Sequence, residues 1–208
     1  STDAVELTSA SAADSGAPVT VVRVPAHAAP LRFAVAIAPL GVTPPAVSPP
    51  LPSALARPRW PTEVRTRVNV SASPDAYVVD DVELPMGNPW RRHVRISDIQ
   101  FLADGTGVGI TLDGDVWLAR DIAAPAGVVR WKRFASGLHE PLTVAIRDDQ
   151  IFAFDRNGVW RLHDVDGDGE ADRHELFSNA FAQTADSREF PSTIRLGPDG
   201  EFVIAKGG

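Results

Sequence analysis

The sequence predicts an all-β fold in the form of an incomplete β-propeller, preceded by β-strands and a Pro-rich strap. Three observations in residues 94–208 support this prediction. Short runs of β-branched and aromatic residues alternate with Asp-Gly and Asn-Gly turns, which are hairpin signals. Helical periodicity is absent. The pattern also repeats, because GDVWL at residues 114–118 is echoed by NGVWRL at residues 157–162. Units of roughly 40–50 residues with four strands each are typical of propeller blades.

The strand-like runs fall into two full units and a third that has only begun. In the first unit, strands are expected at residues 99–103, 108–112, 116–119 and 130–135. In the second unit, they are expected at residues 142–146, 151–154, 159–162 and 174–177. The third unit has expected strands at residues 192–196 and 202–205, joined by a turn at Pro198-Asp199-Gly200. The chain therefore offers about two and a half four-stranded blades.

Such a set of blades is too small to close, because a propeller has about four to eight of them. Open sheet edges and a half-covered core must be shielded in a stable protein. We therefore expect protein partners for this chain. Either other chains or the missing part of the same polypeptide would complete the fold.

The N-terminal part of the chain changes character twice. Residues 1–17 are small and polar and are expected to form a flexible leader or tether. Residues 18–38 form a β-strand segment, with apolar runs at residues 19–24 and 31–37.

Prolines dominate the next segment, residues 39–61, which we call the Pro-rich strap. Such a composition favours polyproline II and cannot supply the hydrogen bonds of a central strand. We expect the strap to pack on a partner or on the rest of the chain. Residues 62–93 are then a β-strand connection to the partial propeller at residues 94–208.

Composition excludes several classes of function. The net charge of −7 opposes binding to nucleic acid. The chain has no cysteine, so it holds no disulfide, no thiolate metal site and no covalently attached haem. The longest apolar run, residues 33–42, contains a proline. It is about half as long as the roughly 20 residues of a membrane-spanning helix, so no transmembrane helix is expected.

The strongest chemical motif is DVDGDGEADRHE at residues 164–175, which we call the acidic loop. Its spacing matches the oxygen-ligand pattern of a calcium-binding EF-hand loop. The expected ligands are Asp164, Asp166, Asp168, the Glu170 carbonyl, Asp172 and Glu175. Ala171 departs from the pattern, and the flanking segments look like strands rather than helices. We therefore expect a structural calcium ion and not a sensor. The alternative is a solvated acidic turn, although carboxylates this close together repel one another without a cation.

Other candidate residues have weaker support. His139 lies where one predicted blade leads to the next, so it is either a ligand or general base in a central channel or a hydrogen-bonded junction residue. His163 and His174 flank the acidic loop and are expected at the surface or behind the ligands. Trp60 and Trp90 lie outside the repeats and could anchor an interface, whereas Trp117, Trp131 and Trp160 are expected in the core. The basic residues Arg91, Arg92, His93 and Arg95 are expected on a solvated face, with an anion site as the alternative.

Several segments together resemble one family of large secreted proteins. They are PRWP (58–61), AYVVD (76–80), LP (84–85), NPW (88–90), DGDVW (113–117), WKRFASGLHEPL (131–142) and residues 161–172. The resemblance covers residues 58–206. The family comprises membrane-bound dehydrogenases and haem-binding β-propeller proteins of planctomycete-type (PVC) bacteria. Its propellers are similar to those of quinoprotein glucose and sorbosone dehydrogenases.

The resemblance implies a propeller fold and a link to redox proteins, but two family features are missing. Full-length members add a cytochrome c domain with a CxxCH motif, and this chain has no cysteine. Members also carry a His-Glu-Phe after the second blade, where this sequence has Arg188-Glu189-Phe190. His139 and the acidic loop do match the family.

These observations leave three hypotheses about function. The first is a non-catalytic, calcium-stabilised propeller subunit that is a structural or interaction element of an extracytoplasmic redox assembly. The second is part of a quinone- or haem-linked sugar or alcohol dehydrogenase, with His139 as the first residue to test, although pyrroloquinoline quinone is not expected on this chain alone. The third is a glycan-binding module that uses Trp60 or Trp90.

The expected location is periplasmic or otherwise extracytoplasmic, with membrane association only through partners. It rests on the family resemblance, on the acidic loop and on the N-terminus. The sequence starts at Ser1 without an initiator Met, which indicates a removed leader or a trimmed chain.

Overall fold

The all-β class is confirmed by a computed structural model. It describes residues 6–11, 16, 18–24, 38–39, 41–43, 57–125, 127–181 and 189–207. Fourteen strands, β1 to β14, and no helix occur in this part of the chain. Consequently, the described residues include no helix that is long and apolar enough to cross a membrane. The chain divides into two compact units, Ser1–Pro52 and Ser53–Gly208.

The first unit contains one antiparallel hairpin. It is formed by β1 (Glu6–Ser11) and β2 (Pro18–Arg23), with Glu6 opposite Arg23. The apolar run at residues 19–24 predicted β2, whereas β1 lies in the segment that was expected to be a flexible leader. Residues 6–11 are only weakly apolar, and their strand is defined by pairing with β2. The second expected strand, residues 31–37, lies outside the described residues.

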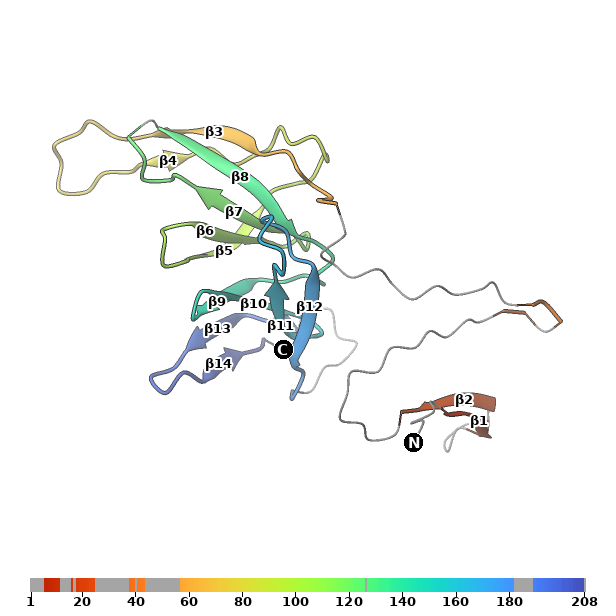
Figure 1. Cartoon of the computed structure of the whole chain (residues 1–208). Coiled ribbons are helices and arrows are strands. Elements are labelled where there is room, and N and C mark those ends of the chain that lie inside the picture. The colour runs from red at the N-terminus through yellow and green to blue at the C-terminus, as the bar shows by residue number, and fades with distance from the viewer. Residues whose placement is uncertain are drawn as a thin grey trace. The chain divides into compact units, whose positions relative to one another are not determined.

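The second unit contains three antiparallel sheets, labelled by strand in Figure 1. The first sheet has the order β4-β3-β8-β7-β6-β5. Its strands are β3 (Val64–Asn69), β4 (Asp81–Val82), β5 (Ile96–Phe101), β6 (Gly107–Thr111), β7 (Val116–Arg120) and β8 (Val128–Ala135). The second sheet has the order β12-β11-β10-β9. Its strands are β9 (Thr143–Arg147), β10 (Gln150–Asp155), β11 (Gly158–His163) and β12 (Arg173–Ser178). The third sheet consists of β13 (Thr193–Leu196) and β14 (Phe202–Ala205).

The strands from β5 onward lie within a few residues of the expected positions and pair in chain order. Each of the first two sheets therefore contains a four-stranded meander, as the repeat predicted. The connection at residues 62–93 supplies β3 and β4, which extend the first sheet beyond β8. The sheets form a curled, open array, and their assignment as propeller blades remains a prediction.

Turn geometry explains one glycine of the repeat. Gly114, in the turn between β6 and β7, has a φ of 89°. A Cβ atom at this position would lie 2.2 Å from the carbonyl oxygen of Leu138. The Gly114 carbonyl also accepts a hydrogen bond from the Leu138 amide, at 3.2 Å. The position therefore requires a residue that adopts positive φ and has no Cβ atom, and only glycine meets both requirements.

The core lies between successive sheets. Side chains alternate along β7, so Leu118 faces the second sheet and Trp117 faces the opposite way. The first cluster joins the first two sheets through Val108, Ile110, Leu118, Phe134, Val144, Ile151, Ala153 and Leu162. Trp117 and Trp131 are fully buried against residues of β3, β4 and the chain that follows β4, including Leu84 and Trp90. These two tryptophans therefore belong to the core, as expected. Phe152 and Phe154 join the second sheet to Ile194 of the third.

Hydrogen bonds link β5, β9 and β13, which are edge strands of the three sheets. The Asp98 carboxylate on β5 accepts hydrogen bonds from Thr143 Oγ1 (2.8 Å) and from the Val144 amide (3.2 Å) on β9. Thr143 Oγ1 in turn accepts the amide of Ile194 on β13, at 3.3 Å. Figure 1 shows the three sheets following one another in chain order. The strands β5, β9 and β13 are therefore consecutive neighbours in the array.

Candidate metal-binding loop and the clamp beside it

The acidic loop connects β11 to β12, and its fold follows from its own side chains. The Asp164 carboxylate accepts hydrogen bonds from the amides of Gly167 (2.7 Å) and Gly169 (2.9 Å). Both glycines have positive φ, 78° and 83°. The Asp–Gly spacing therefore bends the chain back over Asp164, as the sequence motif requires.

Three of the expected ligands come together. Oxygen atoms of Asp164, Asp166 and Asp172 all lie within 4.8 Å of one another. The Asp172 carboxylate also accepts the amide of Val165, at 2.7 Å, which ties the two ends of the loop together. This geometry can present several carboxylate oxygens to one hard cation, such as Ca²⁺.

Asp168 lies outside this group of three. Its carboxylate accepts the amide of Glu170, at 2.8 Å. Burial raises the pKa of Asp168, and the negative charges of Asp166 and Glu170 raise it further. The side chain therefore occupies a site where negative charge is not favoured.

Glu175 also lies outside the group of three. Its carboxylate contacts His163 Nε2 at 2.6 Å. The reason is the strand that follows the loop: β12 pairs with β11 from Arg173 onward, opposite His163. A helix at this point would turn the twelfth residue of the loop back toward the first, but an extended strand carries Glu175 away.

Glu170 has a role that the sequence did not predict. Its side chain is buried, and its carboxylate accepts the backbone amides of Arg59 (2.7 Å) and Trp60 (2.7 Å) at the end of the Pro-rich strap. It also accepts Lys132 Nζ, at 3.1 Å, from β8. The predicted ligand atom of Glu170 was its carbonyl oxygen, and the carboxylate is fully engaged elsewhere.

Lys132 completes a clamp on the strap. Its ammonium group donates a second hydrogen bond to the carbonyl of Trp60, at 3.2 Å. The side chains of Lys132 and Glu170 are only 6% and 5% exposed, so both charges are removed from water. Breaking such a pair would leave one charge buried without a counter-charge, which is strongly destabilising. The basic residues within the predicted strand at residues 130–135 were a sequence signal that buried acidic partners exist.

Further contacts fasten the acidic loop to its surroundings. Arg59 donates to the carbonyl of Ala171, at 2.9 Å, and the Ala171 amide donates to the carbonyl of Phe134, at 2.8 Å. Ala171 is buried in the first core cluster, which explains why a small residue replaces the larger apolar one. The guanidinium groups of Arg59 and Arg133 lie 4.6 and 4.2 Å from the centre of the Trp60 ring.

The candidate histidines are placed differently from one another. The His139 side chain is exposed, and its backbone makes the contacts: the amide donates to Asp155 (2.9 Å), and the carbonyl accepts the amide of Arg156 (3.1 Å). His163 contacts Glu175, as described above. His174 is partly buried; burial lowers its pKa, and the positive charge of Arg59 adds to this effect.

Arg92, Arg95 and Trp90 participate in structural contacts. Arg92 and Arg133 donate to the fully buried carboxylate of Asp115, at 2.7 and 2.8 Å. Arg95 pairs with Asp113, at 2.8 Å. Trp90 packs on Trp117 with a ring-centre distance of 5.8 Å. The ring of Trp90 and two members of the expected basic face are therefore engaged within the fold.

Residues 75–208 match a family model, which is described as a domain of unknown function (DUF7133). This chain belongs to the DUF7133 family. The match includes β5 to β14 and the acidic loop, so the predicted repeat and its loop are parts of a DUF7133 domain. The strap and β3 precede it. Comparisons with curated proteins and with solved structures gave no match.

Proposed function

We propose that this chain is a non-catalytic, calcium-stabilised β-propeller-type element of an extracytoplasmic assembly. The observation that carries the proposal is the position of the acidic loop. Its second half contacts β8 and the strap through Glu170 and Ala171. Its first half holds the group of three carboxylates. A cation bound there fastens the second sheet to the first sheet and to the strap.

The assignment of the sheets as blades is supported by their order. Two antiparallel four-stranded meanders follow one another, and a third sheet begins after them. Their first strands are consecutive neighbours through Asp98, Thr143 and Ile194. In a propeller, the first strand of each blade lies closest to the central axis. Other chains, or the rest of the same polypeptide, supply the remaining blades.

The residues of the acidic loop fit Ca²⁺ because their donors are oxygen atoms only. Asp164, Asp166 and Asp172 would hold the ion through carboxylates, the Glu170 carbonyl would add a neutral oxygen, and water would complete the about six to eight ligands that Ca²⁺ prefers. The ion would supply positive charge to a loop crowded with negative charge. The strands on both sides of the loop favour a structural ion over a sensor.

The non-catalytic assignment is supported by the contacts of the candidate groups. His139 engages its neighbours through its backbone. The buried carboxylates of Asp115 and Asp155 accept hydrogen bonds from arginine, tryptophan and backbone donors. The resemblance to the PVC-type family supports an extracytoplasmic location next to redox proteins. It is also the only support for the alternative that this chain is part of a dehydrogenase.

Calcium binding is tested by thermal unfolding with Ca²⁺ and with a chelator. At a Ca²⁺ concentration of about 100 times Kd, binding to the folded state adds about 2.7 kcal/mol of stability. For a chain of this size, this raises Tm by roughly 5–10 °C. Asp166→Asn should abolish the increase.

The matched control is Asp199→Asn, which removes an exposed carboxylate in the turn between β13 and β14. It should retain the full Tm increase. Absence of any Ca²⁺ effect on the unsubstituted protein would contradict the proposal. Equal loss of the effect in both variants would show a non-specific charge effect.

The competing functions have their own tests. Dye-coupled oxidation of sugars and alcohols, with Ca²⁺ and pyrroloquinoline quinone supplied, should show no turnover. Turnover that His139→Ala removes would establish the dehydrogenase alternative. Retention on a polysaccharide column that depends on Trp60 or Trp90 would establish glycan binding.

A further inference from the structure

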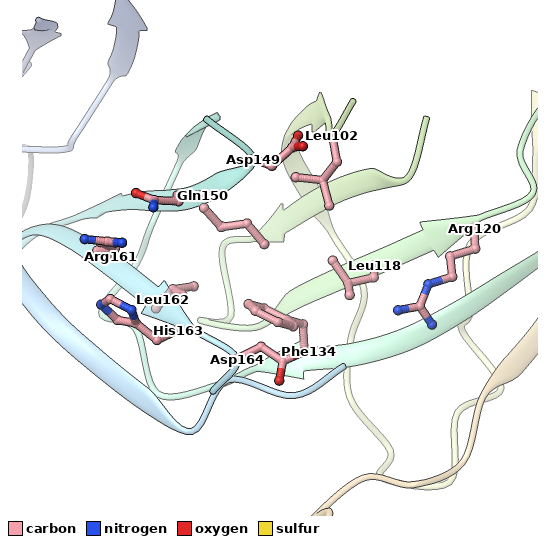
Figure 2. Close-up of a pocket in the computed structure, with 11 residues that line it drawn as sticks. Leu102, Leu118, Arg120, Phe134, Asp149, Gln150, Arg161, Leu162, His163 and Asp164 are labelled. Carbon is pink, nitrogen blue, oxygen red and sulfur yellow. The ribbon is translucent and has the colours of Figure 1, made fainter. Parts of the chain in front are cut away.

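A pocket of about 360 Å³ lies between the first and second sheets. Its volume falls within the range of small-molecule sites. Figure 2 shows the residues that line it. The apolar part of the lining is formed by Leu102, Leu118, Phe134, Ile151 and Leu162. The polar part is formed by Arg120, Asp149, Gln150, Arg161, His163 and Asp164.

Arg161, on β11, is the charged lining residue whose side chain has no partner in the described residues. Within the described part of the chain, its side chain makes no hydrogen bond or ion pair, and its Nε atom is buried without an acceptor. A buried guanidinium donor without an acceptor is costly, since it has lost its water. A ligand with an anionic group removes this cost.

The acidic lining residues accept hydrogen bonds from other groups, and neither of them contacts the Arg161 side chain in the described residues. Asp149 accepts the amide of Ala103, at 2.8 Å, across the gap between the two sheets. Asp164 accepts two backbone amides of the acidic loop. His163 contacts Glu175, and Arg120 contacts Glu63 at 3.4 Å. Among the charged residues of the lining, Arg161 is therefore the one whose side chain has no hydrogen-bond or ion-pair partner in the described residues.

The turn that contributes Asp149 to the lining has a strained backbone conformation. Asp148 and Asp149 form the turn between β9 and β10, and both have positive φ, 52° and 56°. Two consecutive non-glycine residues in this region are uncommon, and such a backbone conformation is strained. The turn directs the Asp149 carboxylate to Ala103 of the first sheet. The strain therefore accompanies a contact that fixes the two walls of the pocket relative to each other.

We propose that this pocket binds a small amphipathic anion. An apolar body lies against Leu118 and Phe134, and a carboxylate or similar anionic group accepts hydrogen bonds from Arg161. Figure 2 shows Arg161 and Arg120 at opposite ends of the pocket, with these apolar side chains between them. The pairing of a planar guanidinium with an anion gives orientation, and the apolar lining gives burial. The proposal does not depend on calcium binding by the acidic loop.

The test compares two fluorescent probes of similar shape and different charge. They are 8-anilinonaphthalene-1-sulfonate and its uncharged analogue, N-phenyl-1-naphthylamine. The unsubstituted protein should bind the sulfonate more tightly. Arg161→Gln should raise the Kd for the sulfonate about tenfold, because a charge-assisted contact is lost. It should change the Kd for the neutral probe less than about twofold.

Two further variants complete the test. Arg65→Gln removes an exposed arginine of β3 that does not line the pocket, and it should leave both Kd values unchanged. Arg161→Lys retains the charge and should recover part of the affinity for the sulfonate, which separates a charge effect from a folding effect. The proposal is overturned if the unsubstituted protein does not prefer the sulfonate. It is also overturned if Arg161→Gln weakens both probes equally or if Arg65→Gln has the same effect.

Discussion

Two buried charges hold the end of the strap, at Arg59 and Trp60, against the sheets of the second unit. Glu170 accepts two strap amides, and Lys132 donates to both Glu170 and the strap. Each charge compensates for the other, since neither side chain reaches water. Arg59 and Trp60, at the end of the strap, are therefore held by hydrogen bonds and by a buried ion pair.

Removing one member of this pair should be strongly destabilising. Glu170→Gln leaves the Lys132 charge buried without a carboxylate, which costs about 3–5 kcal/mol in comparable buried pairs. Addition of Lys132→Met should recover part of this loss, because no uncompensated charge then remains. Urea unfolding of the two single variants and the double variant gives the coupling energy.

An exposed ion pair provides the control for this experiment. Asp121 lies 2.6 Å from Arg130, and both side chains are substantially exposed, at 43% and 34%. Asp121→Asn should therefore cost less than about 1 kcal/mol. If Glu170→Gln lowers the free energy of unfolding no more than Asp121→Asn does, the buried pair of Glu170 and Lys132 does not stabilise the fold as described.

At the scale of the element, turns determine where the sheets meet. The turn between β6 and β7 packs on the backbone of Leu138, in the connection between the first two sheets. The turn between β9 and β10 reaches Ala103 of the first sheet through Asp149. The acidic loop, between β11 and β12, reaches β8 through Ala171. Hairpin turns therefore do more than reverse the chain, because they also fasten neighbouring sheets.

Gly114→Ala should test this role. The new Cβ would lie 2.2 Å from the Leu138 carbonyl oxygen, and φ at this position is 89°. Strain and displacement together should lower the free energy of unfolding by roughly 2–4 kcal/mol. Gly105→Ala is the matched control, since Gly105 has a φ of 83° but no heavy atom within 4 Å of the added Cβ. Its cost should be limited to backbone strain. Equal losses in the two variants would rule out the contact with Leu138.

At the scale of the whole molecule, the third sheet is open. In the described residues, β14 pairs with β13 alone, so its outer edge has no strand partner. Val203 and Ile204 on β14 are 56% and 36% exposed. Exposed apolar strands with free edges tend to pair with further strands.

We therefore expect the protein from its natural source to be part of a larger particle. Native mass spectrometry, with each component chain identified, measures this directly. For the isolated chain, self-association through the open edge should be reduced by Val203→Lys, because a charged edge residue opposes strand pairing. A folded, monomeric 22.2 kDa species under all conditions would contradict the expectation.

The sequence by itself determined the all-β class, the strands from β5 to β14 and the bend of the acidic loop. These features depend on neighbouring residues: alternation and β-branched runs define strands, Asp-Gly and Asn-Gly define turns, and Asp164 accepts amides only three and five residues away. Strands that follow one another in the chain pair with each other, so their pairing could be predicted from the repeat.

Only the tertiary structure decided which groups meet across long separations. Glu170 and the Trp60 amide are 110 residues apart, and no local pattern indicates that they are in contact. The same holds for the pairing of β3 with β8, for the position of Glu175 away from the three aspartates, and for the pocket around Arg161. Such contacts depend on how whole sheets stack, and stacking is set by the summed burial of many side chains rather than by any short motif.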